Sequence, residues 1–206
     1  MIFVLFATTS LLIIHHGQCA MQATANVQLD GTSQSIGTLQ FYQSDPSSAV
    51  KITGALSLSN ASSNLGFHVH AVGVSESMPN CTGAGSHFNP YNTSHGPREA
   101  NITSRHVGDL GNIATLANGT AIINIEDKII QLYPSNQSII NLSIVVHYGM
   151  DDGGSTGIKD STTTGNAGGR VACGLIKLAS SNGLMNKPTL STLFLTIVLT
   201  FVIFLY

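Results

Sequence analysis

The stretch Val50-Lys51-Ile52-Thr53 alternates apolar and polar side chains, the pattern of a β-strand with one face in a core and one in water. Similar short β-rich segments, separated by turn residues, recur at 25–29, 36–42, 50–58, 66–72, 120–125, 141–148 and 170–178. Helical periodicity is poor, and Gly, Ser, Thr and Asn are abundant. The sequence therefore predicts an all-β domain built as an antiparallel sandwich or barrel.

Two stretches are too long for simple hairpins. Gly73 to Arg105 and Gly149 to Gly169 are rich in Gly, Pro, Ser and Thr. Loops of this length in a compact domain are usually functional or disordered. We expect functional residues in both.

The first residues have the pattern of a secretory signal peptide. Met1 to Ile14 is almost wholly apolar, and the small pair Cys19-Ala20 follows a short polar stretch. The apolar run is too short to span a bilayer. We expect cleavage after Cys19, so that residues 1–19 are the signal peptide.

The C-terminal residues 190–206 form an apolar and hydroxyl-bearing tail. Small residues at 179–183 and a short polar spacer at 186–189 precede it, which is the pattern of a GPI-attachment signal. We expect attachment at Ser181 and removal of 182–206, a simple tail anchor being the alternative. One domain, 20–181, would then lie outside the cell, held to the outer membrane leaflet by lipid or secreted.

The charge and the cysteines narrow the class of protein further. The net charge of −2 gives no reason to expect a nucleic-acid partner. Removal of Cys19 leaves Cys81 and Cys173, and an even pair in an exported protein predicts a disulfide. Closing this loop is worth roughly 4–5 kcal/mol in the chain-entropy model. Glycosylation motifs support passage through a secretory pathway and lie at Asn60, Asn80, Asn92, Asn101, Asn118, Asn136 and Asn141.

Histidines are concentrated in three places. The chain has eight, and outside His15 and His16 of the signal segment every one lies in a predicted strand or in the first long loop, which His106 closes. His68 and His70 project to the same face of one strand, because side chains alternate along a strand. Imidazoles suit copper and zinc, and an added carboxylate suits zinc.

Five segments together resemble the signatures of copper–zinc superoxide dismutases, in the family's order and at nearly its spacings. They are GFHVH (66–70), CTGAGSHFNP (81–90), HVGDLGN (106–112), VVHYGMDD (145–152) and TGNAGGRVACG (164–174). The resemblance covers about residues 25–178. It implies an eight-stranded Greek-key β-barrel or sandwich with a metal-binding loop and an electrostatic loop. It also implies an enzyme that converts two superoxide radicals to dioxygen and hydrogen peroxide by Cu(II)/Cu(I) cycling beside Zn(II).

The resemblance assigns a role to each matching residue. Copper ligands would be His68, His70, His87 and His147. Zinc ligands would be His87, His95, His106 and Asp109, so that His87 bridges the two metals and carries a proton. Asp151 would link His68 to His95, Cys81 and Cys173 would form the family's disulfide, and Arg170 would attract and orient superoxide.

Some positions depart from the family's pattern. Lys159 and Asp160 stand where two acids are usual in the family, and 162–164 are threonines where a lysine is common, so we expect steering of the substrate to be weaker or differently distributed. Asn141 and Lys177 replace small residues at the family's dimer surface, so we expect no tight homodimer. Two alternatives are a copper-binding module without turnover and a glycosylated β-sandwich adhesion domain. The complete ligand set together with Arg170 favours the enzyme.

Overall fold

The computed structural model describes residues 19–59, 63–157 and 159–179. The predicted signal peptide up to Gln18, the Asn60 glycosylation motif and the predicted attachment site Ser181 therefore lie outside the described residues. Within the described ranges, no helix has the length and apolar character needed to cross a membrane.

Nearly all of the regular structure is strand. The strands are β1 (Met21–Leu29), β2 (Ser35–Gln43), β3 (Val50–Ser57), β4 (Asn64–His70), β5 (Asp109–Ala114), β6 (Thr120–Asp127), β7 (Ser143–His147), β8 (Arg170–Leu175) and β9 (Lys177–Leu178). The short 3₁₀-helix η1 (Cys81–Ala84) lies in the first long loop, and the short α-helix α1 (Ser161–Thr164) lies in the second.

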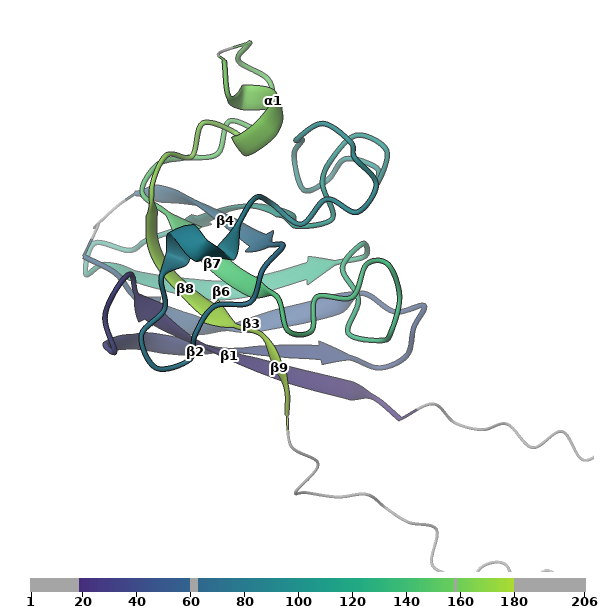
Figure 1. Cartoon of the computed structure of the whole chain (residues 1–206), viewed down its shortest axis with the longest axis horizontal. Coiled ribbons are helices and arrows are strands. Elements are labelled where there is room, and N and C mark those ends of the chain that lie inside the picture. Colours follow the sequence, from purple (N-terminus) through teal and green to yellow (C-terminus); the bar gives the residue numbers. More distant parts are fainter. Residues whose placement is uncertain (1–18, 60–62, 158, 180–206) are drawn as a thin grey trace, which may run out of the picture.

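The strands form one antiparallel sheet in the order β5-β4-β7-β8-β1-β2-β3-β6, with β9 paired to β1 beside this path. The neighbours β3–β6, β4–β7 and β1–β8 are not consecutive in the chain, as in a Greek key. The two end strands return toward each other, since Thr115, just after β5, forms an isolated bridge to Ala121 of β6. The predicted eight-stranded barrel is confirmed as a nearly closed barrel (Figure 1).

Alternating burial places the core inside this barrel. In β6, and in β2 from Leu39 onward, every second side chain is buried, which leaves the other face in solvent. Strands β4 and β7 differ, because six of the seven residues of β4 and all five of β7 are buried. Something must therefore cover their outer face, and the two long loops lie over this part of the barrel (Figure 1).

The structure corrects the strand predictions at two places. The strand β5 was not predicted, because Gly111 and Asn112 interrupt its apolar pattern. The predicted strand 170–178 is divided at Ile176, which exchanges backbone hydrogen bonds with Leu142 and Asn141. The chain there leaves its pairing with β7 and continues as β9 against β1.

Candidate metal centre

The outer face of β4 and β7 carries three histidines. Phe67 and Val69 of β4 belong to the barrel core, so His68 and His70 point to the opposite face. His147 ends β7 and reaches the same place, with its ring centroid 4.9 Å from that of His68. His87, from the first long loop, forms an isolated bridge to His70 and brings a fourth ring.

Two of these rings point lone pairs at each other. The Nδ1 atoms of His70 and His147 lie 2.9 Å and 3.1 Å from the backbone carbonyls of Gly85 and Gly168. A carbonyl can only accept, so both Nδ1 atoms carry the proton. Their Nε2 atoms are thus unprotonated in the neutral rings, yet they lie 3.2 Å apart. A cation between them satisfies both lone pairs.

The other two rings of this group have unpartnered nitrogens. His68 donates from Nε2 to Asp151 Oδ2 at 3.0 Å, which leaves its buried Nδ1 without a hydrogen bond. His87 Nε2 is also buried and without a partner. Buried polar atoms are rarely left unsatisfied. With the two Nε2 atoms above, they make a four-nitrogen group of His68, His70, His87 and His147.

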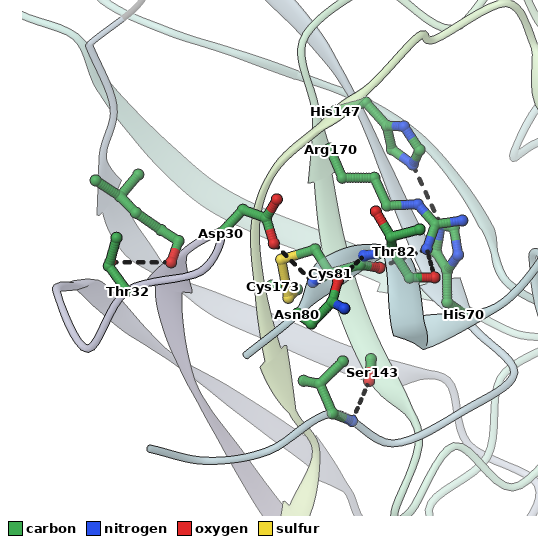
Figure 2. The surroundings of a disulfide bond; sticks show 12 residues. Asp30, Thr32, His70, Asn80, Cys81, Thr82, Ser143, His147, Arg170 and Cys173 are labelled. Atoms are coloured by element: carbon green, nitrogen blue, oxygen red, sulfur yellow. Dashed lines mark hydrogen bonds between the residues drawn. A yellow bond between two sulfur atoms is a disulfide. The ribbon is translucent and has the colours of Figure 1, made fainter. Parts of the chain in front are cut away.

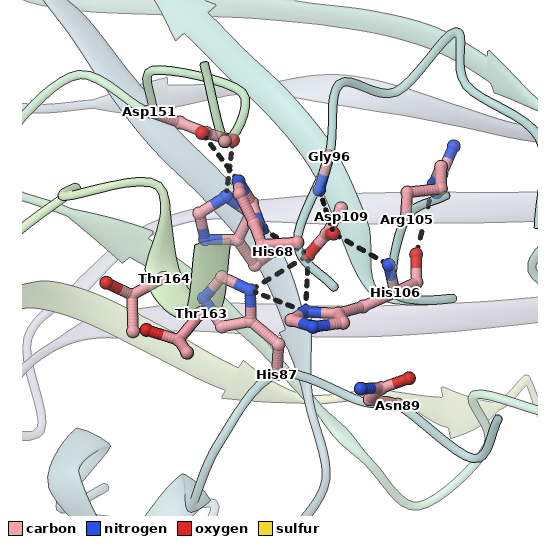
Figure 3. A network of polar contacts seen from close by, with 12 residues as sticks. His68, His87, Asn89, Gly96, Arg105, His106, Asp109, Asp151, Thr163 and Thr164 are labelled. Atoms are coloured by element: carbon pink, nitrogen blue, oxygen red, sulfur yellow. Dashed lines mark hydrogen bonds and ion pairs between the residues drawn. The ribbon is translucent and has the colours of Figure 1, made fainter. Parts of the chain in front are cut away.

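A second group surrounds one carboxylate oxygen. Asp109 Oδ1 lies 2.8 Å from His87 Nδ1, 3.0 Å from His95 Nδ1 and 3.1 Å from His106 Nδ1. Its Oδ2 accepts from the backbone N–H groups of His106 and Gly96, which fix the carboxylate (Figure 3). The four residues are buried and offer three nitrogens and one oxygen.

His87 belongs to both groups. Its Nδ1 lies in the three-nitrogen, one-oxygen group, and its Nε2 lies in the four-nitrogen group. Asp151 makes a second link, because its two oxygens lie 3.0 Å from His68 Nε2 and 2.8 Å from His95 Nε2. All the metal-ligand residues predicted from the sequence are thus brought together, with Asp151 between the two groups.

The electrostatics of the site favour bound cations. Burial lowers the pKa of His68 to about 3 and that of His147 to about 4, so both rings are neutral at neutral pH. Burial opposes ionisation of Asp109, but hydrogen bonds from His106, His87 and His95 outweigh it and lower the Asp109 pKa. Burial lowers the pKa of His95 too, but Asp109 and Asp151 outweigh it and raise that pKa to about 9.

The donor chemistry fits copper and zinc. Four imidazole nitrogens suit copper, and three imidazoles with one carboxylate suit tetrahedral zinc. Asp151 does what a carboxylate commonly does around a metal site, since it accepts the second N–H of His68 and His95 and so fixes their tautomers. The residues therefore fit both metals.

Arg170 lies beside the four-nitrogen group. It begins β8 opposite His147 of β7, and its guanidinium donates to the backbone carbonyls of Cys81, Thr82 and Gly85. It lines a pocket together with His70, His87, His147, Asp160, Thr163 and Thr164. A cation in the lining of this pocket suits a small anionic ligand.

The predicted disulfide is confirmed. Cys81 and Cys173 are bonded, and both are fully buried in a small cluster with Val74, Ala84 and Val145. The bond joins η1 to β8, which are the two segments that hold and carry Arg170 (Figure 2).

Some supporting residues were not predicted. Asn112 exchanges two 2.8 Å hydrogen bonds with the backbone of Asp151 and so fixes that carboxylate. Arg105 precedes His106 and forms a 2.7 Å ion pair with Asp127, although both side chains are almost fully buried. Asn112 lies in the HVGDLGN segment, but no local pattern marks Arg105 or Asp127.

The fold and the site together define a β-barrel protein with two adjoining, buried groups of metal-ligand residues. The family model described as copper/zinc superoxide dismutase (SODC) matches residues 35–176. The chain is 43% identical over 149 residues to "Superoxide dismutase [Cu-Zn]" of Neurospora crassa, which covers 72% of this chain and 94% of that protein. It is 44% identical over 157 residues to the Cryptococcus neoformans protein of that name, covering 76% and 98%.

A third relative is "Superoxide dismutase [Cu-Zn] 5" of Dictyostelium discoideum. The chain is 44% identical to it over 159 residues, which cover 77% of this chain and 99% of that protein. This chain belongs to the copper/zinc superoxide dismutase family. It is an oxidoreductase whose cofactors are copper and zinc, and its substrate is superoxide.

Proposed function

We propose that the two histidine groups divide the metals between them and that Arg170 serves the substrate. Copper is held by His68, His70, His87 and His147. Zinc is held by His87, His95, His106 and Asp109. The observation that carries this assignment is His87, whose Nδ1 and Nε2 belong to different ligand groups and whose Nε2 is buried without a partner.

The reaction is the conversion of two superoxide radicals and two protons to dioxygen and hydrogen peroxide. When bound, copper supplies the one-electron exchange between Cu(II) and Cu(I), while redox-inactive zinc fixes the geometry of its ligands. Arg170 attracts the superoxide anion and orients it in the pocket. His87, which lines the same pocket, would hold a proton at Nε2 only while that nitrogen is free of copper, and would deliver it as peroxide forms. Water supplies the second proton.

A substitution at His87 tests the assignment of the metals. His87→Ala removes one ligand from each group, whereas His106→Ala removes a ligand from the zinc group alone. We expect His87→Ala to weaken both metals and His106→Ala to weaken zinc much more than copper, measured as metal content after dialysis against a chelator. If His87→Ala left copper binding unchanged, the shared-ligand assignment would be wrong.

We also propose that the domain works outside the cell, anchored by lipid or secreted. Asn80, Asn92, Asn101, Asn118, Asn136 and Asn141 are the glycosylation motif asparagines within the described residues, and each of them is exposed. The disulfide also supports an oxidising compartment. An endoglycosidase shift in mass tests glycosylation, and release from cells by a phosphatidylinositol-specific phospholipase tests the anchor. A protein retained in the cytosol without glycans would contradict the proposal.

The surface around Lys177 supports the proposal that the protein is no tight homodimer. Lys177 Nζ lies 2.9 Å from both carboxylate oxygens of Glu76, and both side chains are about half exposed. Asn141 is exposed and supplies a second polar group, with a glycan where its motif is used. Burying these groups in an apolar interface is unfavourable. Light scattering on the glycosylated protein should give the mass of one chain, and a stable two-chain particle would contradict the proposal.

A further inference from the structure

The turn after β1 is held between the two segments that position Arg170. The Asp30 N–H donates to the carbonyl of Val171, the residue that follows Arg170, at 3.1 Å. The Gly31 N–H donates to the carbonyl of Pro79 at 2.8 Å. The side chain completes the link, because the Cys81 N–H donates to Asp30 Oδ1 at 2.7 Å (Figure 2).

Cys81 also begins the cradle, the set of backbone carbonyls that holds Arg170. The guanidinium donates to the carbonyls of Cys81, Thr82 and Gly85, all in or next to η1. The donors of a guanidinium form a rigid planar fork, so a rotation of these carbonyls turns the whole group. The Gly85 carbonyl also faces His70 Nδ1 at 2.9 Å, which ties the same cradle to the four-nitrogen group.

The disulfide alone does not fix this cradle. It limits the separation of Cys81 and Cys173, but the peptide groups on either side of Cys81 can still turn about its backbone dihedrals. A hydrogen bond on the Cys81 N–H fixes the direction of the peptide group between Asn80 and Cys81, which leads into η1. The Asp30 side chain supplies this bond from an exposed position, where it contributes nothing to the barrel core.

We propose that Asp30 is a positioning residue for Arg170: it orients the peptide group that enters η1 at Cys81 and, through η1, the guanidinium that meets the substrate anion. The Asp30 side chain reaches η1 through the Cys81 N–H. Its charge also lies near Arg170, because burial lowers the pKa of that guanidinium and Asp30 partly opposes the shift, so the hydrogen bond and the charge must be tested separately. The inference rests on the proposed role of Arg170. It predicts that the acceptor atom of Asp30, rather than its charge, is what the enzyme needs.

Three substitutions at Asp30 separate the acceptor from the charge. Asp30→Ala removes both, Asp30→Asn keeps an acceptor oxygen and removes the charge, and Asp30→Glu keeps the charge and displaces the oxygen. Thr32→Ala is the matched control, because Thr32 bonds to Leu29 and Gln34 within the same exposed turn and not to Cys81. Arg170→Ala is the reference for complete loss of the guanidinium.

Two readouts report the orientation of Arg170 in the full-length, metal-loaded protein. The first is kcat/KM for superoxide. The second is the dissociation constant of azide, a small probe anion, followed by the visible absorption of the copper-loaded protein. Copper content, zinc content and intact disulfide are measured on every variant, because a purely structural defect would change these instead.

Asp30→Ala should lower kcat/KM and weaken azide binding by roughly 3- to 10-fold, the size expected when one orienting hydrogen bond is lost. Asp30→Glu should also lower kcat/KM and weaken azide binding. This variant tests the proposal if Asp30→Ala does not fold. Asp30→Asn should stay within about twofold of the wild type, as should Thr32→Ala.

The outcomes distinguish the role of Asp30 from the role of Arg170. If Asp30→Ala and Asp30→Glu behave like the wild type while Arg170→Ala is impaired, Asp30 has no positioning role and the function of Arg170 stands. If Asp30→Asn is as impaired as Asp30→Ala, the charge acts rather than the hydrogen bond, and the positioning proposal is wrong. If Arg170→Ala itself leaves both readouts unchanged, the proposed role of Arg170 fails.

Discussion

The buried ion pair between Arg105 and Asp127 permits a quantitative prediction about the loop that carries His106. The side chains are 1% and 2% exposed, and their charged atoms lie 2.7 Å apart. Arg105 also donates to the carbonyls of His106 and Val107 at 3.0 Å and 3.1 Å. Asp127→Ala would leave a buried guanidinium without its counter-charge.

The expected loss follows from burial. Removing one partner of a buried pair typically costs about 3–5 kcal/mol of unfolding free energy. In addition, Asp127 Oδ1 accepts the backbone N–H groups of Ile129 and Ile130, so the upper part of this range is expected. For a domain of this size the loss corresponds to a fall in Tm of roughly 6–20 °C.

The assay is urea unfolding of the metal-free protein with its disulfide intact, because bound metal would add its own stabilisation. The matched control is Lys177→Met, which breaks the exposed ion pair between Lys177 and Glu76. The side chain of Lys177 is 48% exposed and that of Glu76 is 59% exposed. That substitution should cost at most about 1 kcal/mol. If Asp127→Ala costs no more than Lys177→Met, the reasoning from burial is refuted.

Four further predictions concern the metal centre and its pocket. The Asp151→Asn side chain can no longer accept hydrogen bonds from both His68 and His95, so zinc affinity should fall by about 10- to 100-fold in a chelator competition. Unchanged zinc affinity would contradict the role of Asp151 in linking the two histidines. Gly165→Ala should act in the same direction, because a Cβ there would lie 2.0 Å from Asp151 Oδ1 at a backbone φ of +62°; a zinc affinity equal to the wild type would show that the loop can shift. Thr163→Lys places a second cation at the pocket of Arg170 and should raise kcat/KM severalfold at low ionic strength. Added salt should remove this gain, because it screens the attraction of the substrate anion. An effect that does not depend on salt would exclude electrostatic steering. In the metal-free protein, burial lowers the pKa values of His68 and His147 from 6.5 to about 3 and about 4, so the unfolded chain binds protons below about pH 6.5 that the folded chain does not. Its unfolding free energy should therefore fall as the pH drops from about 6.5 to 4, and urea midpoints that stay constant over this window would contradict the assigned burial.

The sequence predicted the barrel well where side chains alternate and less well where tertiary contacts decide. The alternating residues Val50 to Thr53 lie in β3, as predicted. β5 was missed because its Gly111 and Asn112 break the alternation, and the strand forms there through pairing with β4. Similarly, only the contacts of Ile176 show that the last predicted strand changes partners.

The same difference holds for the site. Histidines gathered in short motifs are visible in a sequence, and the fold brings those of the two ligand groups together. The residues that hold these motifs in place are single side chains whose partners are distant in the chain. Asp30 reaches Cys81, and Arg105 reaches Asp127, across turns and strands that no local pattern records.

We propose a complete two-metal site whose substrate is oriented by Arg170. The most direct measurement is the copper and zinc content of the purified protein together with its superoxide turnover, beside the Arg170→Ala variant. The account predicts one copper and one zinc in each chain, rapid turnover by the wild type, and an Arg170→Ala variant that keeps both metals and loses most of kcat/KM. A fully metal-loaded wild-type protein that does not turn over superoxide would contradict it.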